Sequence, residues 1–257
     1  MWEIELGVIL VCGGAAMLGG FIDAIAGGGG LITMPALLLC GVPPHQALAA
    51  NKVSACVGTA AALGNFMRSG LVLWRVALAG LGFSLAGAWV GSFLTLHIAP
   101  DVLGRILVVL LPAAMLATLF PPRARQEGGL APVQGPRLWL TVPPLCLLIG
   151  VYDGFFGPGT GSFLILAFHW LLGMGLIHAS ATAKVLNLAS NVGGSVTFIW
   201  HGKVVWPLAL VMIACCVLGN WLGSRLAIRR GAGAVRGFLL VSLSLLMLTL
   251  IWEYFLA

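Results

Sequence analysis

Four ionisable residues lie inside long apolar stretches of the chain, where charge is least expected. They are two aspartates, Asp23 and Asp153, and two lysines, Lys52 and Lys184. An ionisable side chain at membrane depth is costly and marks a functional site by default. We expect the aspartates to take up protons or to bind a coupling cation. The lysines are expected to attract an anion or to balance the aspartates.

Two structural alternatives remain open for these residues. Each aspartate precedes the end of an apolar stretch, so its carboxylate could cap backbone amides at the membrane interface. A lysine near a helix end can extend its long side chain to the lipid headgroups. Function is favoured for the aspartates because the other acidic residues map to termini or loops.

Two glycine-rich breaks follow the aspartates at the same distance, at residues 27–30 and 157–162. Glycine lets a ligand approach the backbone, and each break opens a short helix whose N-terminal N–H groups suit an anion. Close helix packing through small residues is the alternative, and the asparagines could instead join neighbouring helices. The candidate substrate contacts are Gly27, Gly28, Gly29, Gly30, Thr33, Asn51, Lys52, Gly157, Gly159, Thr160, Gly161, Ser162, Lys184, Asn187 and Asn191.

Enzymatic motifs are missing from the sequence. It contains no nucleophile–base signature, no nucleotide-binding loop and no metal-ligand spacing among its six cysteines. We therefore expect no catalytic residue, no metal and no cofactor. The formal net charge of +6 resides in short connecting loops. That placement indicates membrane orientation rather than nucleic-acid binding.

The composition places most of the chain in lipid. Hydrophobic residues make up 60% of the sequence and charged residues 8%, against about 25% charged in a soluble domain. The pattern predicts an all-α polytopic integral membrane protein. Ten apolar segments are expected, at 6–26, 31–41, 46–66, 73–96, 102–120, 138–156, 162–174, 179–200, 204–228 and 235–256. Segments 31–41 and 162–174 are short for a crossing, which favours broken or half-helices, either crossing or re-entrant.

An internal repeat divides the chain into two copies of five segments each. Lys52 and Trp74 recur as Lys184 and Trp206, a shift of 132 residues. Upstream, Asp23 recurs as Asp153, a shift of 130 residues. An odd number of segments per copy predicts inverted topology, a plan known from secondary transporters. The predicted divisions are a first copy at 1–121, a cytoplasmic linker at 122–137 and a second copy at 138–257.

The basic residues predict the orientation. With the N-terminus outside, most arginines fall at the inner face, while Arg105 and Lys203 fall outside. Both termini are then outside an inner membrane. The N-terminus lacks the positive region of a signal peptide, so the first apolar segment is expected to be a retained helix. The arginines of the inner face are Arg68, Arg75, Arg123, Arg125, Arg137, Arg225, Arg229, Arg230 and Arg236.

Three motifs carry a family resemblance over nearly the whole chain. The stretch 20–35 resembles the first signature of the TauE/SafE sulfite exporters, also called toluene-sulfonate uptake permeases. Residues 50–52 (Ala-Asn-Lys) and the stretch 150–163 look like the other two signatures. The resemblance implies transport of sulfite, sulfonates, sulfoacetate or related organosulfur acids. It leaves the substrate and the direction open.

A secondary transporter for a sulfur-containing anion, coupled to protons or sodium, is the expected function. A passive anion channel would use the same helix ends without coupled carboxylates. A membrane accessory subunit without transport of its own is a further alternative. The expected partners are a small anionic substrate and the lipid bilayer, with homodimerisation left open and no nucleic acid.

Overall fold

The structure, a computed structural model, describes residues 6–107, 109 and 135–255, with side chains as far as 231 except 136 and 137. Every regular element in these ranges is a helix. Most of the predicted segment 102–120 and of the linker 122–137 lies outside the described residues, although a helix covers 100–107. The helices are α1 (Leu6–Ala26), α2 (Gly30–Leu39), α3 (Pro44–Arg68), α4 (Trp74–Leu96), α6 (Pro136–Phe155), α7 (Thr160–Leu172), α8 (Leu176–Trp200) and α9 (Trp206–Phe255).

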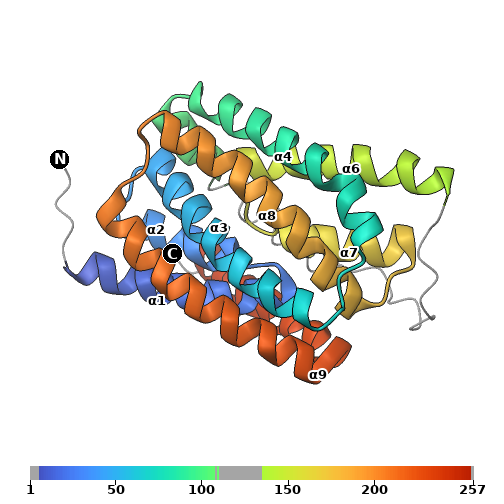
Figure 1. The fold of residues 1–257 in the computed structure, drawn as a ribbon. Helices are drawn as coiled ribbons and strands as arrows, with labels where there is room; N and C mark the ends of the chain where they lie inside the picture. Colours follow the sequence, from blue (N-terminus) through green and yellow to red (C-terminus); the bar gives the residue numbers. More distant parts are fainter. Residues whose placement is uncertain (1–5, 108, 110–134, 256–257) are drawn as a thin grey trace.

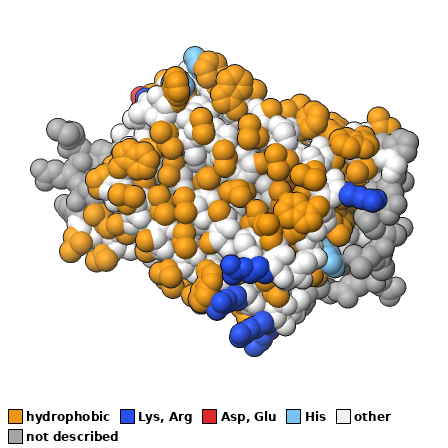
Figure 2. All heavy atoms as spheres, in the orientation of Figure 1, with side chains coloured by type: hydrophobic (Ala, Val, Ile, Leu, Met, Phe, Trp, Pro, Cys, Tyr) orange, Lys and Arg blue, Asp and Glu red, His pale blue; other side chains and the backbone are white. Residues whose placement is uncertain are grey.

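Four of the described helices are long and apolar enough to cross a bilayer, which confirms the all-α membrane fold. They are Leu6–Ala26, Trp74–Leu96, Leu138–Phe155 and Trp206–Gly231. The chain kinks at Gly231 (φ 62°, ψ −150°) within α9, between the predicted segments 204–228 and 235–256. Figure 2 shows hydrophobic side chains over most of one face, as contact with lipid requires.

The helix boundaries follow the sequence repeat. Helices α3 and α8 are both 25 residues long, and their first residues lie 132 positions apart, as do those of α4 and α9. Figure 1 shows α3 and α8 in the middle of the molecule, with α1 and α9 on one side and α4 and α6 on the other. The first helix of each copy therefore packs against the fourth helix of the other copy.

Glycines bring these paired helices into backbone contact. A Cβ atom added at Gly91 of α4 would lie 2.1 Å from the carbonyl oxygen of Val151 on α6. A Cβ added at the repeat-related Gly223 of α9 would lie 2.2 Å from the carbonyl oxygen of Phe21 on α1. Small residues allow this approach in membrane helices, where packing rather than water drives association.

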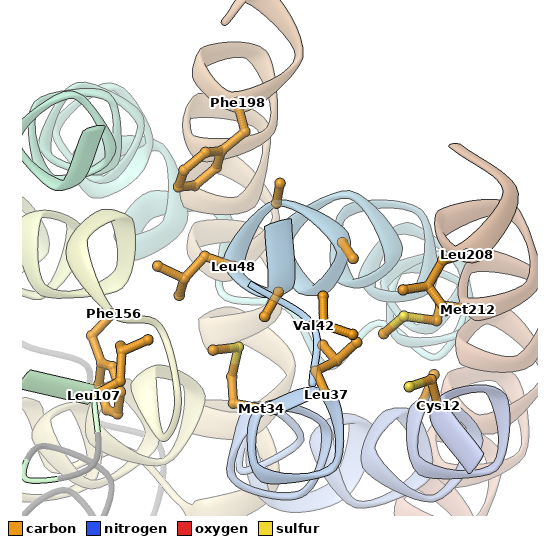
Figure 3. Packing of buried hydrophobic residues seen from close by; sticks show 14 of the residues in the cluster. Cys12, Met34, Leu37, Val42, Leu48, Leu107, Phe156, Phe198, Leu208 and Met212 are labelled. Carbon is orange, nitrogen blue, oxygen red and sulfur yellow. The ribbon is translucent and has the colours of Figure 1, made fainter. Parts of the chain in front are cut away.

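The two short helices are embedded in protein. At 10 and 13 residues, α2 and α7 reach roughly 15–20 Å at 1.5 Å per residue, less than the ~30 Å of a hydrocarbon core. Figure 3 shows Met34 and Leu37 of α2 packed among Cys12, Leu48 and other buried apolar side chains. Helix α7 has its own buried cluster around Phe168. Helix ends at membrane depth are tolerated when protein surrounds them in this way.

Two glycines of α4 test the role of this close packing. We expect Gly91→Ala to destabilise the protein by about 1–3 kcal/mol, because its methyl group would displace α6. The matched variant Gly82→Ala should be neutral or slightly stabilising, since a Cβ there meets nothing within 4 Å. Thermal unfolding in detergent measures both. Equal unfolding temperatures for the two variants would contradict the packing role of Gly91.

Candidate functional site

The four ionisable residues of the apolar segments form two ion pairs, and each pair joins the two copies. Nζ of Lys52 lies 2.7 Å from Oδ1 of Asp153. Nζ of Lys184 lies 2.7 Å from Oδ2 of Asp23. The exposed fractions of the side chains are 1% for both lysines, 2% for Asp153 and 14% for Asp23. Both lysine side chains end at aspartates inside the protein and not at its surface, so the snorkelling alternative does not describe this structure.

The helices place the four charges by repeat-related geometry. Both lysines lie two turns into the central helices α3 and α8. Both aspartates lie in the last turn of the first helix of a copy, α1 or α6. Those helices end because Gly27 (φ +78°) and Gly157 (φ +93°) adopt the left-handed conformation that favours glycine. Each aspartate is thereby held at a helix end, facing a lysine of the other copy.

A small cavity lies between the two glycine-rich breaks. Its volume of about 30 Å³ has room for water but not for an organic anion. It brings together Asp23, Asp153 and ten of the predicted substrate contacts, whereas Gly28, Gly159, Thr160, Ser162 and Lys184 do not line it. The ten contacts are Gly27, Gly29, Gly30, Thr33, Asn51, Lys52, Gly157, Gly161, Asn187 and Asn191.

The two breaks contact each other directly. The backbone N–H of Ser162 donates to the carbonyl oxygen of Gly27 at 3.2 Å, and its hydroxyl donates to the carbonyl oxygen of Ala26 at 2.7 Å. A Cβ on Gly27 would lie 2.2 Å from the carbonyl carbon of Gly161. In this conformation the N–H of Ser162 therefore serves as a contact between the copies. The N–H of Thr160 also has a partner, since it donates to the carbonyl oxygen of Gly157 at 3.2 Å.

Side-chain amides extend the polar network. The Thr33 hydroxyl donates to Oδ1 of Asn51 at 2.5 Å, which joins α2 to α3. Asn191 donates from Nδ2 to Oδ1 of Asn187 at 3.2 Å, and Nζ of Lys52 lies 3.5 Å from Oδ1 of Asn191. The amides thus join helices, as the structural alternative held, and they also line the cavity.

Sequence reasoning missed several residues of the cavity, of which Asn220 on α9 is the most informative. Its Oδ1 is buried without a hydrogen-bond partner among the described residues, and so is Oδ2 of Asp153. Two unpaired acceptors in one cavity call for water, a proton, a cation or a ligand that donates. The sequence did contain a signal for it: Asn220 is a polar residue within an apolar segment, and the repeat-related position, 132 residues earlier, is Ala88. The other missed residues are Gly19, Gly20, Ser54, Ala55 and Cys216.

The fold and the cavity together define an integral membrane transporter. Lipid-facing helices surround a polar chamber between two broken helices, and irregular backbone at this depth is typical of substrate sites in transporters. The family model described as "Sulfite exporter TauE/SafE" matches residues 12–250. The chain belongs to this family, as the resemblance predicted.

Curated relatives agree with this class. The chain is 38% identical to "Probable membrane transporter protein YfcA" of Escherichia coli (strain K12), over 93% of this chain and 87% of the relative. It is 41% identical to "Probable membrane transporter protein ORF9" of Sinorhizobium sp, over 88% and 86%. A "Probable membrane transporter protein" of Haemophilus influenzae is 38% identical, over 93% and 91%. No solved structure matches the chain significantly.

The buried ion pairs generate a prediction about stability. Lys52→Met removes one partner and leaves a buried carboxylate, so we expect a loss of about 3–5 kcal/mol. The double variant Lys52→Met with Asp153→Asn is neutral overall and should recover much of this loss. Thermal unfolding in detergent measures the difference. A double variant no more stable than the single one would show that the pair does not govern the stability of this region.

The contact between the breaks generates a second prediction. Gly27 and Gly41 have nearly equal φ values of +78° and +76°, so alanine at either position has a similar backbone cost, about 1–2 kcal/mol. Gly27→Ala adds a clash with Gly161, whereas a Cβ at Gly41 meets nothing within 4 Å. We expect Gly27→Ala to unfold at a clearly lower temperature than Gly41→Ala. Matching temperatures would mean that the breaks do not need to touch.

Proposed function

We propose that this protein is a secondary transporter that carries a small sulfur-containing anion, such as sulfite, a sulfonate or sulfoacetate, across the inner membrane. The observation that carries the proposal is the presence of two lysine–aspartate pairs between the copies, of which Lys52, Asp153 and Asp23 line one cavity between the breaks. The TauE/SafE family match supports the sulfur-containing class of substrate. The names of the relatives state only transport.

Exchange of ion-pair partners supplies a route to coupling. In the described conformation each lysine is neutralised by an aspartate at 2.7 Å. An anion that takes the place of the carboxylate on a lysine leaves that carboxylate buried and unpaired, which is unfavourable in an apolar surrounding. Uptake of a proton or binding of a sodium ion by the aspartate restores neutrality. Binding of the anion and of the coupling ion then favour each other.

Alternating access follows from the way the two copies meet. The ion pairs and the Ser162–Gly27 contact all cross between the copies, so separating the copies at one side would open the cavity to that side. The present cavity has no room for an organic anion such as a sulfonate, which fits a closed state between the two open ones. In Figure 1, α1 begins at the left and α6 at the right. Opposite directions of these helices support an inverted repeat.

The proposed orientation places both termini outside and the arginine-rich side in the cytoplasm. Most of the basic side chains visible in Figure 2 lie at the lower centre and right of the face shown, away from the N-terminal end of α1 in Figure 1. Such a one-sided distribution supports the positive-inside assignment.

Flux through purified protein in liposomes tests the proposal. We expect wild-type protein to accumulate sulfite or a sulfonate when a proton or sodium gradient is imposed. Asp153→Asn should abolish gradient-driven accumulation and retain some exchange of labelled anion, because it removes the group that takes up the coupling ion.

Two outcomes would contradict the proposal, and a third would change the role of Asp153 alone. Downhill flux without accumulation under either gradient would identify a passive channel. Folded wild-type protein that moves none of sulfite, thiosulfate, taurine, sulfoacetate and toluenesulfonate would favour an accessory subunit. Loss of folding in Asp153→Asn, seen by size-exclusion chromatography, would assign a structural role to Asp153.

A further inference from the structure

The two ion pairs differ in how fully each lysine is engaged. Nζ of Lys184 donates to Oδ2 of Asp23 at 2.7 Å and also to the backbone carbonyl oxygen of Asp23. Lys184 does not line the cavity. Nζ of Lys52 has one close contact, with Asp153, and a longer one of 3.5 Å with Asn191. An ammonium group has three N–H donors, so Lys52 retains capacity for a ligand at the cavity surface.

The side chains that surround the two lysines also differ between the copies. Nζ of Lys52 contacts Asn191 of α8, and Asn191 in turn donates to Asn187, so two amides of α8 extend the network from this lysine. Their repeat-related positions on α3 are Thr59 and Ala55. The Thr59 hydroxyl is buried without a partner among the described residues, so it does not take the place of Asn191 as a contact of the lysine.

The glycine-rich break at 157–162 approaches Lys52 as well. A Cβ added at Gly157 would lie 3.0 Å from Nζ of Lys52, so an anion held by this ammonium would also meet the backbone of the break. Asp153, 2% exposed, lines the cavity with its Oδ2 buried and without a partner among the described residues. This arrangement leaves a donor and an acceptor of one ion pair available at a single place.

We infer that the transporter has one anion site, at Lys52 with the amides of Asn187 and Asn191, and not two equivalent sites. The inference rests on the proposed function and assigns different roles to the two pairs. The ligand class is a small oxyanion with a sulfonate or sulfite group, whose oxygens accept from the ammonium and from the amide N–H groups. The anion displaces the Asp153 carboxylate from Lys52.

Lys184 is a positioning residue. It holds the last turn of α1 through both the side chain and the backbone of Asp23, and this turn leads into the first glycine-rich break. Removal of the Lys184 side chain should slow the conformational cycle more than it weakens binding of the anion. We therefore expect substitution of Lys52 to change the affinity for the anion, and substitution of Lys184 to change the maximal rate of transport.

Charge-neutral double variants separate these roles while leaving no buried charge unpaired. We expect Lys52→Met with Asp153→Asn to abolish the thermal stabilisation by sulfite, sulfoacetate and toluenesulfonate, or to weaken their apparent affinity more than about tenfold. Lys184→Met with Asp23→Asn should keep the affinity and the KM for uptake within about threefold, with a reduced maximal rate. Size-exclusion chromatography and the unfolding temperature without anion confirm folding.

Matched single variants keep the test decisive if a double variant fails to fold. Asn191→Ala should raise the KM for uptake about three- to tenfold, since it removes one hydrogen bond to a charged ligand. The repeat-related Thr59→Ala should leave the KM unchanged.

The outcomes distinguish this inference from the proposed function. Equal loss of anion affinity in the two double variants, or in Asn191→Ala and Thr59→Ala, would overturn the single site while transport itself stands. Wild-type protein that neither binds nor moves any of the three anions would overturn the proposed function, and the single site with it.

Discussion

Charge neutrality in an apolar surrounding is the constraint on which the rest of this structure depends. Two ammonium groups and two carboxylates are largely withdrawn from water, and an unpaired charge in such a place is far less stable than a paired one. Each charge finds its partner on the other copy. The copies are therefore joined at their polar centre as well as through their helix faces.

The same requirement explains why the helices break where they do. A carboxylate can face a lysine of the opposite copy only if α1 and α6 end near the centre and the following chain turns away at Gly27 and Gly157. The short helices α2 and α7 then begin inside the protein, each in its own apolar cluster. Glycines along α4 and α9 allow the backbone contacts that hold α6 and α1 at this depth.

The sequence predicted the parts of this site better than their connections. Lys52, Lys184, Asp23 and Asp153 stood out because charge is rare in apolar segments, and the predicted helix 6–26 has the bounds of α1. Which aspartate faces which lysine depends on helix packing, and no spacing in the sequence encodes it. Asn220 was missed because a neutral amide is a weaker signal than a charge. The contact that uses the N–H of Ser162 depends on the approach of the two breaks in space.

A repeated backbone does not require repeated side chains, and the constraint of neutrality shows where the copies must match. Lysine and aspartate recur in both copies, since losing one would leave a buried charge unpaired. Amides are neutral, so one copy can replace them without that penalty. The repeat-related residue of Asn187 is Ala55, and that of Asn220 is Ala88. Symmetry in the charges together with asymmetry in the amides agrees with the single anion site that we infer.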